Sequence, residues 1–170
     1  MNRLIMSVAT LAVSVIVGNA QAKDIKDTVV SVSLGTEPVT MDPHAASSAL
    51  TTTMHRWVFD SLMHREKGKA IPVPHAAESA TFVDPKTVDF KMREGVKFSN
   101  GEDVDAEAVK FSLLRPRQKD FRTVQAKVLR VIDSVEVVSK WVARVHLKAP
   151  DPGFLNRLSD WGNLVPPKYY

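Results

Sequence analysis

The sequence predicts a mixed α and β fold, in which antiparallel hairpins stand beside separate helices. Residues 87–93 alternate apolar and polar side chains without a fault, which is typical of a strand with one buried and one wet face. Residues 131–138 and 141–147 are two further strand-like runs separated by a short turn, which predicts a hairpin. Apolar residues recur at helical spacing in residues 48–62 and 105–113, which predicts two amphipathic helices.

The segment before the first helix begins with a predicted strand. Residues 28–34 place Val30, Val32 and Leu34 on one face of that strand. A passage rich in proline and aspartate follows, and Ser47 or Ser48 can then cap the first helix. We expect its buried stripe to be Leu50, Met54, Trp57, Val58 and Leu62. We expect its wetter side to carry Thr51, His55, Arg56 and Asp60.

The later elements have clear start and stop signals. Asn100-Gly101 predicts a tight turn after a short strand at residues 96–98. Asp105 is placed to cap the second helix, whose inward residues are Ala106, Val109 and Leu113. After a break at residues 150–153 we expect a short helix with the apolar residues Phe154, Leu155, Leu158 and Trp161.

Residues 1–22 have the pattern of a secretory signal peptide. A positive start at Arg3 precedes a short apolar run, and Ala20-Gln21-Ala22 supplies the small residues that a signal peptidase reads. The apolar run at residues 4–17 would make only about 21 Å of helix, which is short of a bilayer core of about 30 Å. We therefore expect cleavage after Ala22. Because the chain has no cysteine, we expect no lipid anchor and a soluble product in the periplasm of a Gram-negative cell.

The charge balance does not favour a nucleic-acid partner. The formal net charge is +4, and it falls to +3 when Arg3 is removed with the signal peptide. The basic residues are spread along the chain among acidic ones. The one local cluster is interpreted as a solvated loop and consists of Arg115, Arg117, Lys119 and Arg122 around Pro116.

The sequence predicts a protein without catalytic residues, metal or cofactor. It contains no nucleophile elbow, phosphate-binding glycine loop, zincin helix or EF-hand loop. The five histidines form no closely spaced pair, so we interpret them as surface or half-buried side chains rather than metal ligands. The acidic residues at 102–107 lie at a turn and a helix start, where capping and the helix dipole explain them.

Several segments together resemble one family. EPVTMDPH at residues 37–44 is similar to the EPxxLDPH opening of the family 5 extracellular solute-binding proteins, and VFDSL at residues 58–62 matches a further family segment. The most specific match is residues 77–112, where AESA, FKMREGVKFSNG and DAEAVKFS resemble the signature AESW…FKLREGVKFSDG…TAEDVKFS. Ala80 stands where the family usually has tryptophan, and Ala108 replaces the usual acid.

The resemblance implies a fold like the type II periplasmic binding proteins, present only in part. Family members are considerably longer, with two lobes and an extra small domain. We accordingly expect residues 23–61 to begin lobe I, residues 62–149 to form the small α+β domain, and residues 150–170 to re-enter lobe I. The second lobe would be missing, as in a fragment or the product of an interrupted gene.

The resemblance also implies a function. Such proteins are the receptors of ABC importers, and we expect a monomer that binds a peptide and delivers it to an inner-membrane permease. A nickel chelate, haem, glutathione or an opine is the alternative ligand, and a periplasmic hydrolase is a more distant alternative. By position, the family's ligand contacts correspond to Ser47, Ser48 and Ala49, although these serines could serve only as a helix cap. Trp161 is a further candidate for the cleft wall, or a core residue.

Overall fold

The computed structural model describes residues 29, 31–33, 35, 37–46, 48–119, 121 and 123–170. The predicted signal peptide, its cleavage site, Ser47 and Arg122 lie outside the described residues. The chain divides into two units, Met1–Leu34 and Gly35–Tyr170. In the first unit, residues 29 and 31–33 belong to no strand and are exposed, so the predicted strand at residues 28–34 is wrong for these positions. A strand needs a hydrogen-bonding neighbour, and none of the described strands pairs with it.

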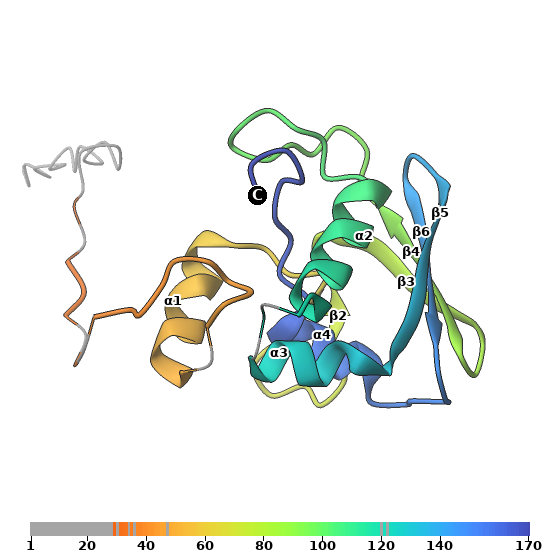
Figure 1. Ribbon diagram of the computed structural model, residues 1–170, viewed down its shortest axis with the longest axis horizontal. Helices are drawn as coiled ribbons and strands as arrows, with labels where there is room; N and C mark the ends of the chain where they lie inside the picture. The colour runs from red at the N-terminus through yellow and green to blue at the C-terminus, as the bar shows by residue number, and fades with distance from the viewer. Residues whose placement is uncertain are drawn as a thin grey trace, which may run out of the picture. The chain divides into compact units, whose positions relative to one another are not determined.

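The second unit is built around a four-stranded antiparallel sheet of order β3-β4-β6-β5, with a separate two-stranded pair β1-β2 (Figure 1). The strands are β1 (Met63–His64), β2 (Val73–Pro74), β3 (Ala77–Asp84), β4 (Thr87–Met92), β5 (Ile132–Ser139) and β6 (Val142–Leu147). The helices are α1 (Ala49–Val58), α2 (Ala106–Leu114), α3 (Val124–Val128) and α4 (Phe154–Trp161), with the 3-10 turns η2 (Arg115–Arg117) and η3 (Leu129–Val131).

The alternation of β4 and β6 produces one dry and one wet face, as predicted. Val88, Phe90 and Met92 of β4 are fully buried, and Phe90 is opposite Ala143 of β6. On the wet face Arg144 of β6 makes two hydrogen bonds, of 2.7 and 2.8 Å, with the carboxylate of Asp89. Helix α2 packs against β4, β5 and β6, and Figure 1 shows it lying across the sheet.

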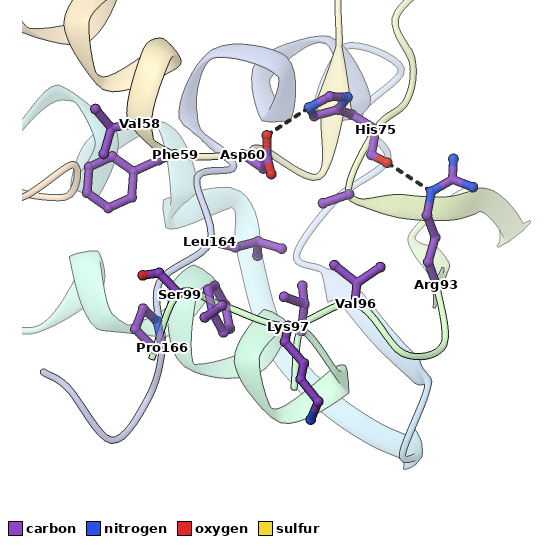
Figure 2. A pocket seen from close by; sticks show the side chains of 13 residues that line it. Val58, Phe59, Asp60, His75, Arg93, Val96, Lys97, Ser99, Leu164 and Pro166 are labelled. Carbon is purple, nitrogen blue, oxygen red and sulfur yellow. Dashed lines mark hydrogen bonds and ion pairs between the residues drawn. The ribbon is translucent and has the colours of Figure 1, made fainter. Parts of the chain in front are cut away.

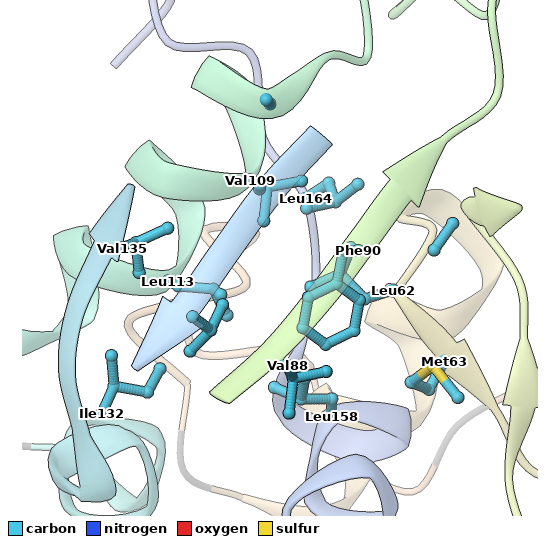
Figure 3. Packing of buried hydrophobic residues seen from close by; sticks show 14 of the residues in the cluster. Leu62, Met63, Val88, Phe90, Val109, Leu113, Ile132, Val135, Leu158 and Leu164 are labelled. Carbon is cyan, nitrogen blue, oxygen red and sulfur yellow. The ribbon is translucent and has the colours of Figure 1, made fainter. Parts of the chain in front are cut away.

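The hydrophobic core lies between the dry face of the sheet and helices α2 and α4. Figure 3 shows Phe90 among side chains from three other segments of the chain. The main members of the hydrophobic core are Leu62, Met63, Val88, Phe90, Val109, Leu113, Ile132, Leu158 and Leu164. The second helix begins as predicted, since the carboxylate of Asp105 accepts a hydrogen bond of 3.1 Å from the amide of Ala108.

Helix α1 buries the face opposite to the one predicted. Thr51 and His55 are buried, whereas Trp57 and Val58 are 58% and 62% exposed. A hydrogen bond explains this orientation of the helix. The His55 ring bonds through Nε2 to the carbonyl of Thr40 at 3.1 Å, and this contact brings the preceding loop onto the face that carries Thr51 and His55. The helix also ends at Val58, so Leu62 reaches the core from an extended segment. No helix in the described part of the chain is long and apolar enough to cross a membrane.

We predict that Phe90→Ala destabilises the protein by about 3–5 kcal/mol, because it removes a fully buried ring from a packed core. The matched control is Phe82→Ala on the edge strand β3, whose side chain is 38% exposed and whose loss should cost about 1 kcal/mol or less. Urea unfolding followed by circular dichroism measures both. Equal losses of stability in the two variants would contradict this position of the core.

Candidate functional site

The loop before α1 is fixed by an ion pair with η2. Arg115 donates hydrogen bonds of 2.9 and 2.6 Å to the two carboxylate oxygens of Asp42, and its side chain is only 13% exposed. Its guanidinium also lies over the rings of Phe121 and Tyr170, at 4.7 and 4.2 Å from their centroids. The interpretation of this basic cluster as a solvated loop is therefore wrong for Arg115, because its guanidinium is largely shielded from solvent and paired with the half-buried carboxylate of Asp42.

His44 is the second anchor of the same loop. Its ring is fully buried, with Nε2 at 3.1 Å from the carbonyl oxygen of Asn163 and Nδ1 at 3.1 Å from a guanidinium nitrogen of Arg115. A carbonyl only accepts and a guanidinium only donates, so the imidazole is neutral, with its proton on Nε2. Thr123 adds a hydrogen bond of 3.2 Å from its hydroxyl to the His44 carbonyl.

The electrostatics of the anchor agree with this geometry. Burial is the main cause that lowers the pKa of His44 from 6.5 to about 4, and the neighbouring Arg115 charge lowers it further. For Asp42, burial by itself raises the pKa of the carboxyl. The hydrogen bonds from Arg115 and from the His44 amide outweigh burial and hold that pKa below its ordinary value. The loop is thus held by a neutral histidine and an ionised aspartate.

Next to this anchor, residues 60–62 run antiparallel to residues 162–164, which are distant from them in the sequence. The amide of Leu62 donates to the carbonyl of Gly162 at 2.9 Å, and the amide of Leu164 donates to the carbonyl of Asp60 at 2.9 Å. Ser61 and Asn163 pair between them in antiparallel fashion. A Cβ on Gly162 would lie 2.5 Å from the Leu158 carbonyl oxygen, so this crossing requires glycine at the end of α4.

The anchored loop presents the N-terminal end of α1, where the ligand contacts are predicted. Ser48 caps the helix, since its side-chain oxygen accepts a hydrogen bond of 3.2 Å from the Thr51 amide. The capping role considered for the serines is thus confirmed for Ser48. Ser48 and Ala49 are both exposed, so the cap leaves this edge accessible, while Ser47 lies outside the described residues.

Ala49 and Trp161 are brought together by the fold. Both line a hollow of about 340 Å³ between α1 and α4, called here the α1–α4 hollow. Its other lining residues are Thr52, Thr53, Arg56, Val124 and Asp160. Arg56 and Asp160 form an ion pair of 2.5 Å across it. Trp161 is half-buried, and its carbonyl accepts a hydrogen bond of 2.9 Å from Gln125, so its position is fixed by α3. Ser48 does not line this hollow.

A second hollow, of about 420 Å³, lies beside the crossing segments (Figure 2). His75 Nε2 is 3.0 Å from a carboxylate oxygen of Asp60, and Arg93 donates a hydrogen bond of 3.2 Å to the His75 carbonyl. Ser99 also lines the hollow but lies across it from His75 in Figure 2. A serine hydrolase needs its hydroxyl within hydrogen-bond reach of the imidazole. In the described part of the chain the serine, histidine and aspartate of this hollow are not assembled in that way.

Metal ligands are likewise not gathered in the described ranges, where no group of three or more His, Asp or Glu side chains is placed to hold a metal ion. The sequence contains no cysteine.

Comparison with known proteins identifies the family. Residues 72–169 match the model of the bacterial extracellular solute-binding proteins, family 5 (middle part), and the chain belongs to this family. The glutathione-binding protein GsiB of Salmonella paratyphi A is 31% identical over 134 residues, which are 79% of this chain and 26% of that protein. GsiB of Escherichia coli K12 is 28% identical over the same share of each chain. The chain thus spans about a quarter of the length of these relatives.

Solved structures give the same result for the fold. The oligopeptide-binding protein AppA of Bacillus subtilis, in complex with a nonapeptide, superposes with a TM-score of 0.72 at 24% identity, over 78% of this chain and 26% of AppA. NikA of Brucella suis, in complex with Fe(III)-EDTA, gives a TM-score of 0.67 at 29% identity, over 79% of this chain and 28% of NikA. The expected family, its non-enzymatic class and a match to part of a type II periplasmic-binding-protein fold are thereby confirmed.

We predict that acid weakens the fold through His44. Its pKa is about 4 when folded and 6.5 when unfolded, so between these values only the unfolded chain binds the proton. Stability should therefore fall by on the order of 3 kcal/mol as the pH drops from 6.5 to 4. Asp42 adds a loss at still lower pH, when its depressed pKa is crossed.

His44→Gln tests this assignment, because its amide can donate to Asn163 and accept from Arg115 without titrating. Unfolding free energies measured between pH 4 and 7 should show a smaller pH slope in this variant. The control His64→Gln, at an exposed histidine, should keep the wild-type slope. An unchanged slope in His44→Gln would show that another group causes the acid sensitivity.

Proposed function

We propose that this chain is part of a receptor that captures small peptides or related solutes and delivers them to the membrane permease of an ABC importer. The observation that carries the proposal is the family match over residues 72–169. The named relatives support a peptide ligand, since GsiB is a glutathione-binding protein and the AppA structure holds a nonapeptide. Glutathione is itself a small peptide, so the two indications agree.

The exposed edge of α1 supports a position for the ligand. Ser47, Ser48 and Ala49 follow the anchored loop, and an extended peptide can lie beside such backbone like an added strand. Ala49 shares the α1–α4 hollow with Trp161, whose half-buried ring offers an apolar wall with a fixed position. Contact of a ligand with Ser47, Ser48, Ala49 and Trp161 is the site that we propose.

The crossing of residues 60–62 with residues 162–164 supports the proposed domain layout. In that layout residues 23–61 and 150–170 belong to lobe I, and residues 62–149 form a small domain inserted between them. A chain that leaves one lobe and returns to it is expected to place its exit and entry side by side, as these hydrogen-bonded segments do. In the same proposed layout the second lobe, which would close over the ligand, lies outside this chain, which spans 26% of the GsiB relative.

The proposed compartment follows from residues 1–22, which have the pattern of a signal peptide cleaved after Ala22. The family's extracellular class supports export. The mature protein would be a monomeric periplasmic receptor.

We predict that the full-length receptor containing this chain retains intact peptides from a mixture, as measured by native mass spectrometry after gel filtration. Trp161→Ala should reduce retention about tenfold, because it removes the apolar wall of the hollow. The matched control is Trp57→Ala, an exposed tryptophan on α1 that does not line the hollow and should leave retention unchanged.

Three outcomes would each contradict part of this proposal. Cleavage of the peptides without retention would indicate a periplasmic hydrolase instead. Co-purification of nickel, haem or an opine, with no affinity for peptides, would keep the receptor class and reject the peptide ligand. Equal loss of retention in the two tryptophan variants would reject Trp161 as a ligand contact while leaving the receptor class intact.

A further inference from the structure

A concave surface on the helical side of the molecule gathers positive charge. The hollow has a volume of about 870 Å³ and lies among η2, α3, η3 and the residue that follows β6. Five cationic side chains line it, and we call it the basic hollow: Arg117, Lys119, Lys127, Arg130 and Lys148. No carboxylate of a described residue is part of its lining. Asp120 and Arg122, whose formal charges cancel, lie outside the described residues.

These cations differ from most others in the molecule. Arg115, Arg144 and Arg157 each pair with an aspartate, but none of the five cations of the basic hollow lies within ion-pair distance of a described carboxylate. Arg117 makes only a long hydrogen bond of 3.5 Å to the backbone carbonyl of Asp133. Like charges around one hollow repel one another, and they attract anions from solution because the concave wall concentrates their field.

The scaffold beneath these side chains is fixed. The amide of Lys148 donates to the carbonyl of Val131 at 2.9 Å, which joins the end of β6 to η3. Thr123 caps α3 by accepting from the Ala126 amide at 3.2 Å, and it donates to the His44 carbonyl. These contacts set the backbone positions of Lys127, Arg130 and Lys148.

The chemistry of the lining matches a phosphate group. A guanidinium binds two oxygens of one phosphate through parallel hydrogen bonds, and ammonium groups add point charges around it. The hollow is larger than a single phosphate needs, and the ring of Phe121 forms an apolar part of its wall. It can therefore hold a phosphate that carries a further charged or organic group.

We propose that the basic hollow binds a phosphate-bearing anion, with Arg117 and Arg130 as bidentate donors and the three lysines as supporting charges. The source of that phosphate is either a soluble polyphosphate or phosphate ester, or the head group of an anionic phospholipid. This site is separate from the α1–α4 hollow, with which it shares no lining residue. An experiment on phosphate binding at the basic hollow therefore tests this proposal independently of the proposed transport function.

Inorganic pyrophosphate is the probe for the first experiment, titrated into the 170-residue chain by isothermal calorimetry at low ionic strength. The double variant Lys127→Glu with Lys148→Glu should bind pyrophosphate at least about tenfold more weakly, since two attractive charges become repulsive. The matched control, Lys67→Glu with Lys91→Glu, makes the same change of net charge at two exposed lysines outside the hollow. It should change the affinity less than about twofold.

Vesicles distinguish the two sources of phosphate. Sedimentation with phosphatidylglycerol vesicles, reversed by added pyrophosphate and absent with phosphatidylcholine vesicles, would support a lipid head group. Pyrophosphate binding without vesicle binding would support a soluble phosphate. The proposal would be overturned if the wild-type chain bound neither probe. It would also be overturned if the two double variants weakened binding equally, because the affinity would then depend on net charge alone.

Discussion

The shielded pair of Arg115 and Asp42 is the interaction on which the arrangement of the site depends. It joins the loop before α1 to the end of α2, while His44 joins the same loop to Asn163 beside α4. An exposed ion pair contributes about 0–1 kcal/mol, whereas removing one partner of a buried pair costs about 3–5 kcal/mol. With side chains 13% and 21% exposed, this pair lies between those limits. It also leaves every polar atom of the His44 ring with a partner, so the three groups form one satisfied network.

The network explains how the exposed edge of α1, where we propose that ligand binds, is held in place. Helix α1 buries few apolar side chains, since Trp57 and Val58 face solvent. Its attachment therefore relies on polar contacts, such as that of the His55 ring with the carbonyl of Thr40 in the preceding loop. The same contacts fix the residues that precede Ala49 and bring Ala49 to the hollow that Trp161 lines. An edge held in this way is pre-organised for the proposed ligand, which reduces the entropy lost on binding.

The sequence predicted the elements whose signals are local. Strand β4 was evident because its alternation is complete, and α2 because Asp105 caps an apolar stripe. Three features were not predicted from the sequence, because each depends on residues that are distant along the chain. Strand β3 is an edge strand with little apolar alternation, the buried face of α1 is chosen by a hydrogen bond to Thr40, and Arg115 finds its partner 73 residues away. Of the site, the position of Ser48 and Ala49 came from a family resemblance, while their meeting with Trp161 required the fold.

Hydrogen exchange in Arg115→Gln tests most directly whether the anchor holds α1 in place. We predict that the Thr52 and Phe59 amides, which donate hydrogen bonds to the Ser48 and His55 carbonyls, exchange at least about tenfold faster than in wild type. Amides of β4 and β6 should keep their protection, and so should α1 in the control Arg144→Gln, which breaks the other bidentate pair on the wet face of the sheet. Unchanged protection of α1 in Arg115→Gln would contradict the account, because the loop would then be held by something other than this pair.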